Sequence, residues 1–191
     1  MIFVMTLAII IQEKPEMRED TMEVTLRKWQ IGDGPSIARY GNNPKIAANL
    51  RDGFPYPYTL ADGRAFVERC IGGDETLQCC RAIVVDGEAV GSIGVFLQTD
   101  VYRKCGELGY WLGEPFWGQG IMTRAVEEIC DHVFANYDVA RIYAEPFAEN
   151  VGSRRVLEKA GFALEGTMRW GAVKNGRLMD WCMYAKLKGK G

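Results

Sequence analysis

The sequence predicts a single α/β domain, in which short strands and amphipathic helices follow one another along the chain. Stretches that alternate apolar and polar residues, as half-buried strands do, recur between longer stretches with apolar residues at helical spacing. The 191 residues suit one domain, and a composition of 48% hydrophobic and 25% charged residues is typical of a globular protein. No repeat, low-complexity tract or linker interrupts this pattern, so we expect one domain over residues 23–188.

The first 22 residues stand apart from that domain. Met1–Ile11 is strongly apolar but too short to span a bilayer. No basic region precedes it, and no small-residue cleavage site follows it, so a secretory signal is disfavoured. We expect residues 1–22 to be an N-terminal leader or extension, or to reflect a start codon placed too early.

The domain begins with a strand and two helices. Val24–Trp29 alternates apolar and polar residues. Gly32–Pro35 is a turn that opens a helix, with Pro35 in the first helical turn. Pro44 starts a second helix, which we expect to run to about Asp52.

An aromatic and proline-rich connector follows at residues 54–58. Its prolines rule out a central strand. Thr59–Asp62 then resembles a helix cap, and apolar residues at helical spacing give the next helix a buried face.

The middle of the chain predicts a β-hairpin. Leu77–Val85 and Glu88–Leu97 are its strands, and Asp86-Gly87 is its tight turn. Gly91 and Gly94 interrupt the second strand, which predicts a bulge or a close backbone approach.

A glycine-rich turn joins the next strand to a helix. Glu107–Leu112 is a short apolar strand, and an amphipathic helix follows the turn at Trp117–Thr123. Gly118 and Gly120 let the backbone turn sharply, and the first helical turn carries unpaired N–H groups. Together these features predict a phosphate or pyrophosphate site, although glycines in such a turn also serve simply to shape a loop.

The last part of the chain predicts a strand, a helix and a hairpin. Arg141–Pro146 is the strand, and Asn150 caps the helix that follows it. Gly161 ends this helix in the left-handed conformation. Ala163–Trp170 and Leu178–Leu187 form the hairpin around a Lys-Asn-Gly turn.

Charge and cysteine content exclude several classes of function. A net charge of −2 without a basic block argues against a nucleic-acid partner. Six cysteines form no C-x-x-C pair, and a single histidine accompanies them, so we expect no zinc or other metal site. Free, buried cysteines of this kind indicate a cytoplasmic protein. A P-loop hydrolase is excluded because no Lys-Ser/Thr follows the glycine-rich turn, and a Rossmann enzyme because no G-x-G-x-x-G is present.

Three stretches carry a resemblance to a known family. They are Gly109–Leu112 with Phe116–Thr123, the helix at Asn150–Phe162, and the connector at Phe54–Thr59. The first two of these stretches, each on the expected element, resemble motifs of the GNAT acetyltransferases. Together with the connector, they resemble more closely the RimJ/RimL-like branch, which acetylates the N-termini of ribosomal proteins. The resemblance covers nearly the whole chain after the leader.

The resemblance implies an α/β (α+β) fold with a mixed, strongly bent sheet of about six to seven strands flanked by helices. Two parallel strands, Glu107–Leu112 and Arg141–Pro146, would splay apart so that the pantetheine arm of acetyl-CoA fills the gap. The pyrophosphate would lie on the amides of Gln119–Thr123. Trp117 and Met122 depart from the common signature, which has Arg or Gln and then Gly or Ala at these places, so close approach of the cofactor at Met122 is in question. The cofactor-binding residues implied are Tyr110, Trp111, Leu112, Trp117, Gly118, Gln119, Gly120, Ile121, Met122, Thr123, Asn150, Ser153 and Arg155.

Acetyl transfer to an amine needs a base, an oxyanion donor and a partner for the departing thiolate. The resemblance implies Glu107 as the base, with Glu145 in reserve; the alternative for Glu107 is a solvated carboxylate at a strand end. Many members carry a tyrosine that acts as the acid where this chain has Leu157, so Ser153 is expected to hydrogen-bond the sulfur instead. The alternative is that Ser153 only hydrogen-bonds backbone groups in the first turn of its helix. The expected acceptor contacts are Phe54, Tyr56, Tyr58 and Glu145, although these rings also suit a core.

We therefore expect an acetyl-CoA-dependent N-acetyltransferase that acts by direct attack in a ternary complex. The acceptor is a primary amine, either a protein N-terminal α-amine or a small-molecule amine, for which Glu107, Glu114 and Glu145 supply carboxylates. The alternative function is a non-catalytic acyl-CoA-binding or regulatory module. We expect a cytoplasmic monomer or homodimer without a nucleic-acid or membrane partner.

Overall fold

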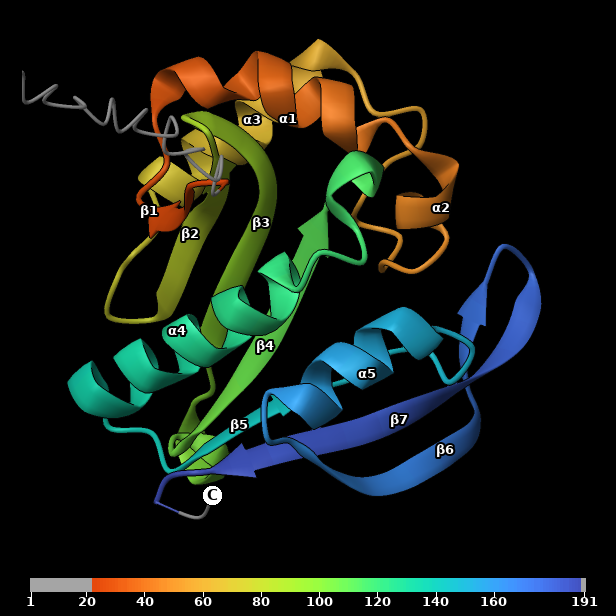
Figure 1. Cartoon of the computed structure of the whole chain (residues 1–191). Coiled ribbons are helices and arrows are strands. Elements are labelled where there is room, and N and C mark those ends of the chain that lie inside the picture. The colour runs from red at the N-terminus through yellow and green to blue at the C-terminus, as the bar shows by residue number, and fades with distance from the viewer. Residues whose placement is uncertain (1–21, 190–191) are drawn as a thin grey trace, which may run out of the picture.

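The computed structural model describes residues 22–189 and shows one seven-stranded sheet with helices on both of its faces (Figure 1). The predicted leader lies outside these residues, except for Met22. The strands are β1 (Val24–Arg27), β2 (Gln78–Val85), β3 (Glu88–Leu97), β4 (Cys105–Leu112), β5 (Arg141–Ala144), β6 (Ala163–Lys174) and β7 (Arg177–Leu187). The helices are α1 (Gly34–Gly41), α2 (Pro44–Ala47), α3 (Leu60–Ile71), α4 (Ile121–Asn136) and α5 (Val151–Lys159), and short 3₁₀ turns are η1 (Ile31–Asp33), η2 (Asp100–Tyr102) and η3 (Glu114–Phe116).

The sheet is mixed, with strand order β1-β2-β3-β4-β5-β7-β6. Only β4 and β5 are parallel, and every other neighbouring pair is antiparallel. The structure thus confirms the expected mixed sheet and its two parallel central strands.

Alternating residues of the strands supply two apolar cores. On β2, Ile83 and Val85 belong to the larger core, which α4 and α5 cover. Ala82 and Val84, one position along, belong to a smaller core with Ile37 of α1. This separation follows from the period of two in a strand, which sends successive side chains to opposite faces.

Local signals placed most element boundaries correctly. Thr59 and Asp62 form a reciprocal capping box at the start of α3. Gly161 has a φ of +85° after α5, as a left-handed terminator requires. Gly91 marks a close approach, because a Cβ there would lie 2.5 Å from the carbonyl oxygen of Trp111 on β4.

The helix expected from Pro44 to about Asp52 is shorter than predicted. Helix α2 ends at Ala47. In the residues that follow, the Asn49 N–H donates to the Ile46 carbonyl and the Leu50 N–H donates to the Ala47 carbonyl. Bonds between residues three apart are those of a 3₁₀ turn, which does not continue as an α-helix. This early end frees the following residues to form a loop over the sheet.

The two parallel strands separate after a short paired stretch. β4 pairs with β5 only at Cys105–Arg141, Gly106–Ile142 and Glu107–Tyr143, whereas its pairing with β3 continues to Leu112. β5 ends at Ala144, two residues before Pro146, which has no N–H to donate. One edge of β4 is therefore left without a partner strand between residues 108 and 112.

Candidate functional site

A cavity of about 1340 Å³ lies where β4 and β5 separate. It is bounded by β4, the start of α4, the start of α5 and the loop between α2 and α3. Most of the residues expected at the site line it. They are Phe54, Tyr58, Glu107, Tyr110, Trp111, Leu112, Trp117, Gly118, Gly120, Ile121, Met122, Thr123, Glu145, Asn150, Ser153 and Arg155. Gln119 and Tyr56 are not among the lining residues; Tyr56 is 54% exposed, and the Gln119 amide donates to the Pro115 carbonyl.

The glycine-rich turn leaves the N-terminus of α4 open to this cavity. Gly118 and Gly120 both have a φ of +75°, a left-handed conformation that disfavours other residues. Gly120 is the N-cap of α4, and no side chain caps this end of the helix. The first N–H groups of α4 are thus available for an anion, and the helix dipole favours one there.

The two departures from the common signature each have a contact of their own within the fold, and both residues also line the cavity. The Met122 side chain is packed in the larger core with residues of α4 and the sheet. The Trp117 indole N–H donates to the Leu112 carbonyl at 2.7 Å, which holds the turn against the end of β4. Neither change removes a backbone N–H from the turn.

A serine and a tyrosine meet on the opposite wall of the cavity. The Asn150 side chain accepts a bond from the Ser153 N–H at 3.1 Å, which confirms Asn150 as the cap of α5. The Ser153 hydroxyl lies 2.8 Å from the Tyr110 hydroxyl. Burial raises the pKa of Tyr110, so this phenol stays protonated and able to donate. Leu157 is buried in the core, as its side chain requires.

Two carboxylates face each other across the separating strands, joined by an arginine. Arg51 donates from Nη2 to Glu107 Oε1 at 2.5 Å and to Glu145 Oε2 at 2.8 Å. The carboxylate side chains are 23% and 26% exposed, whereas that of Arg51 is 71% exposed. Burial and the charges of both carboxylates raise the pKa of Tyr143 on β5, so its phenol stays protonated beside them.

Glu114 does not join this pair of carboxylates. It forms an ion pair with Lys45 and accepts a bond from the Asn43 amide at 2.6 Å. These partners hold η3 against the start of α2.

The aromatic connector is largely part of the smaller core. Phe54 stacks on Tyr58 with ring centroids 4.6 Å apart and meets Trp111 edge-on at 5.7 Å. Burial raises the pKa of Tyr58 to about 12. Phe54 and Tyr58 therefore anchor the loop and also form part of the cavity wall.

Sequence reasoning missed several residues of this site. Arg51 was not anticipated, because its partners lie 56 and 94 residues away. Phe96 lines the cavity and is 40% exposed. In the sequence it is one more apolar residue of a predicted strand, and nothing there indicates a binding site. The hydroxyl of Tyr110 could have been placed near α5 from strand alternation, since Leu108 and Leu112 on the same face pack in the α4 core.

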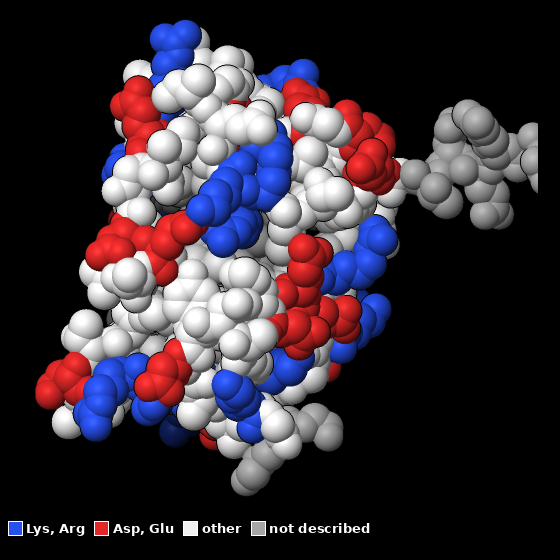
Figure 2. All heavy atoms as spheres, turned by 90° about the vertical axis from the view of Figure 1, so that its left-hand side faces the viewer, with Lys and Arg blue, Asp and Glu red and all other residues white. Residues whose placement is uncertain are grey.

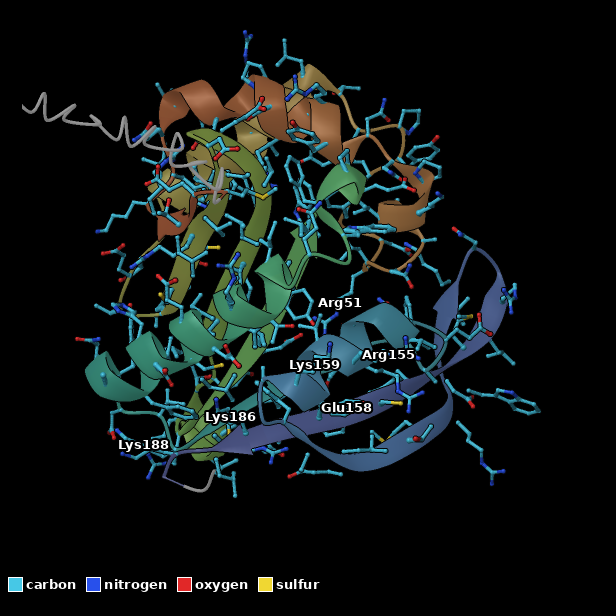
Figure 3. The ribbon with its side chains drawn as sticks, viewed as in Figure 1. Arg51, Arg155, Glu158, Lys159, Lys186 and Lys188 are labelled. Atoms are coloured by element: carbon cyan, nitrogen blue, oxygen red, sulfur yellow. The ribbon has the colours of Figure 1, made fainter. Side chains whose placement is uncertain are left out.

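Basic side chains on α5 divide into two groups. Arg154 donates to the Tyr184 hydroxyl at 3.2 Å and to the Ala148 carbonyl at 3.1 Å, so it ties α5 to β7. Arg155 and Lys159, one turn apart and labelled in Figure 3, line the cavity. Within residues 22–189 neither of them forms an ion pair.

On the face seen in Figure 2, basic and acidic side chains form several small, separate clusters among uncharged residues. In the part of the chain that the structure describes, no three or more His, Cys, Asp or Glu side chains are grouped to hold a metal ion. Across those same residues, no helix has the length and apolar character needed to cross a membrane.

Comparisons with known proteins agree with this architecture. The acetyltransferase (GNAT) domain family matches residues 23–163. The uncharacterized N-acetyltransferase p20 of Bacillus licheniformis is 28% identical over 88% of this chain and 94% of its own length. The ribosomal-protein-serine acetyltransferase of Escherichia coli is 30% identical over 55% of this chain and 58% of its own.

Among solved structures, RimL, a ribosomal L7/L12 α-N-protein acetyltransferase in complex with coenzyme A, has the same fold. It superposes with a TM-score of 0.77 at 24% identity, covering 86% of this chain and 93% of RimL. With its mixed sheet, separated parallel strands and matching domain, the chain belongs to the GNAT family of acetyl-CoA-dependent N-acetyltransferases.

Proposed function

We propose that the protein transfers the acetyl group of acetyl-CoA to a primary amine by direct attack in a ternary complex. One observation carries the proposal: the unpaired edge of β4 and the carboxylates of Glu107 and Glu145 meet where β4 and β5 separate. An unpaired strand edge offers backbone donors and acceptors to an extended ligand. The carboxylates lie beside that edge, where an amine would approach a bound thioester.

The residues present suit a coenzyme A donor. The uncapped first turn of α4 would hold the pyrophosphate, and the edge of β4 at residues 108–112 would pair with the amides of the pantetheine arm. Asn150 and Ser153 line the opposite wall, and Arg155 supplies a cation without an ion-pair partner among the described residues.

Each step of the transfer then has a group to serve it. Glu107 takes a proton from the acceptor ammonium, and Glu145 is the reserve base. The neutral amine attacks the thioester carbonyl, and a backbone N–H of β4 stabilises the oxyanion. When the C–S bond breaks, the hydrogen-bonded pair of Ser153 and Tyr110 hydroxyls gives one proton to the departing sulfur, and the second proton of the acceptor nitrogen returns to that pair through solvent. The Tyr110 phenol can supply the acid that Leu157 cannot provide. This counts against a purely non-catalytic module.

Two acceptor classes remain within this proposal. The name of the Escherichia coli relative, ribosomal-protein-serine acetyltransferase, favours a protein N-terminal α-amine. Another relative, the L-amino acid N-acetyltransferase AaaT of Escherichia coli, is 25% identical over 87% of this chain and favours a small amine. The carboxylate pair suits the ammonium group of either.

The test is release of coenzyme A from acetyl-CoA in the presence of candidate amines. The panel holds peptide amides with varied N-terminal residues, beginning with serine, together with free amino acids and alkylamines. We expect turnover with at least one class and acetylation of its amine by mass spectrometry. Tight coenzyme A binding with no turnover on any amine would favour the non-catalytic module.

A further inference from the structure

Arg51 lies between two cavities. A second cavity of about 410 Å³ adjoins the first, and Asn49, Arg51 and Glu145 line both. Its other walls come from the loop after α2, from the β6–β7 hairpin with the aromatic side chain of Trp181, and from Phe147 in the segment between β5 and α5. Figure 3 labels Arg51 between α4 and α5, near the middle of the view. The Arg51 side chain therefore belongs to the partition that separates the two spaces.

The guanidinium of Arg51 holds the position that an acceptor cation needs. One of its nitrogens, Nη2, bonds both Glu107 and Glu145, and so bridges the carboxylates of the two separating strands. A primary ammonium has three N–H donors and is compact enough to bridge the same pair. The two cations cannot occupy that position together.

Arg51 is also the most exposed part of this arrangement. Its side chain is 71% exposed and extends from the loop that follows the short helix α2, whereas both carboxylates are mostly buried. Ion pairs with one such exposed partner are weak, because water solvates the released cation well. Loss of the Arg51 contacts would leave two carboxylates in need of a cation.

We propose that Arg51 is a displaceable stand-in for the acceptor ammonium and sets the affinity of the enzyme for its amine. The inference rests on the proposed function, because it concerns the same carboxylates. Arg51 closes the partition while the site is without an acceptor. A cationic primary amine that carries an apolar or aromatic group enters by the second cavity, displaces the guanidinium and bonds Glu107 and Glu145. Arg51 thus competes with the acceptor instead of binding it.

The proposal predicts a gain of acceptor affinity when the guanidinium is removed. Arg51→Gln should lower the KM for the best peptide or amine of the panel by about threefold to tenfold, the range expected from the loss of weak, exposed ion pairs. The kcat should not fall, and the KM for acetyl-CoA should stay unchanged. Arg51→Lys keeps a competing cation, so its acceptor KM should lie above that of Arg51→Gln.

The matched control is Arg39→Gln. Arg39 is an exposed arginine of α1 that pairs with Glu88, and it does not line either cavity. This variant should keep the kinetic constants of the wild type. An acceptor KM that is unchanged or raised in Arg51→Gln overturns the proposal, since a residue that binds or merely positions the acceptor gives that result.

A binding measurement separates this proposal from the proposed function. Phenethylammonium chloride, a primary ammonium with an aromatic group, is titrated by calorimetry into the full-length wild type and Arg51→Gln. We expect tighter binding to the variant by a similar factor. If no amine is turned over, the proposed function fails and this titration alone decides the role of Arg51. Equal binding, or none to either protein, overturns the role.

Discussion

Glu107→Gln should reveal both the base and the class of the acceptor. The substitution keeps the shape of the side chain and removes its charge. Arg51 keeps its bond to Glu145, and because Arg51 is mostly exposed, loss of its pair with Glu107 should cost only about 0–1 kcal/mol of stability. The variant should therefore fold normally and bind acetyl-CoA as the wild type does, with a lower kcat.

The expected loss of kcat depends on the fraction of the acceptor amine that is neutral in solution at the assay pH. Without a base, the variant depends on acceptor that has lost its proton in solution. An α-amine with a pKa of about 7.8 is roughly 14% neutral at pH 7, so the defect should be about tenfold. An alkylamine with a pKa of about 10.4 is neutral in only about 1 molecule in 2500 at pH 7, so the defect should reach about a thousandfold.

The assay is coenzyme A release by wild type and variant between pH 6.5 and 10. For an α-amine acceptor, the difference in rate should disappear by about pH 9, and for an alkylamine it should persist beyond that pH. An unchanged kcat at pH 7 on an acceptor that the wild type uses would refute the assignment of Glu107. Glu145→Gln then becomes the next variant to measure.

Three further outcomes are expected. Tyr110→Phe should lower kcat by about tenfold or more at pH 7 and by less at pH 9, where a departing thiolate with a pKa near 8.5 needs no proton; equal rates at pH 7 would contradict the role of the phenol. Tyr58 has a folded pKa of about 12 against about 10 when unfolded, so the stability that its protonated form contributes is complete below pH 10 and is lost as the pH rises to 12. Between pH 9 and 11 the wild type should lose about 1.4 kcal/mol more than Tyr58→Phe, as measured by urea unfolding. Met122→Ala should lower the free energy of unfolding by about 2–5 kcal/mol while the affinity of the folded protein for coenzyme A changes little, since the backbone amides remain; a large loss of affinity alone, seen by calorimetry, would place its side chain in the cradle.

The sequence predicted those features whose causes are local. The Thr59–Asp62 capping box, the Asn150 cap and the left-handed Gly161 each depend on residues within a few positions of one another. The Asp86-Gly87 turn placed a hairpin between Leu77–Val85 and Glu88–Leu97, and its strands pair as expected, with one irregularity between Ile83 and Val84. Each of these signals acts over a turn or a strand, so a single sequence contains it.

What the sequence did not predict depends on segments that meet only in the folded chain. The Ser153 and Tyr110 hydroxyls are 43 residues apart in sequence, and the residues that bond Arg51 are farther still. The length of α2 was overestimated because nothing in residues 44–52 opposes a helix strongly. The 3₁₀ turn that ends it is stabilised partly by the Asn49 amide, which donates to the Lys45 carbonyl.

The short pairing of β4 with β5 also affects how the molecule resists unfolding. Only three residue pairs join the β1–β4 half of the sheet to the β5–β7 half, although the apolar core continues beneath the join. This seam is the narrowest hydrogen-bonded section of the sheet, and local opening should begin along it. A donor substrate bound between the strands would join the two halves. At a free concentration of a hundred times its Kd, it would raise the free energy of unfolding by about 2.7 kcal/mol. The stability of the fold would then rise and fall with the concentration of that substrate.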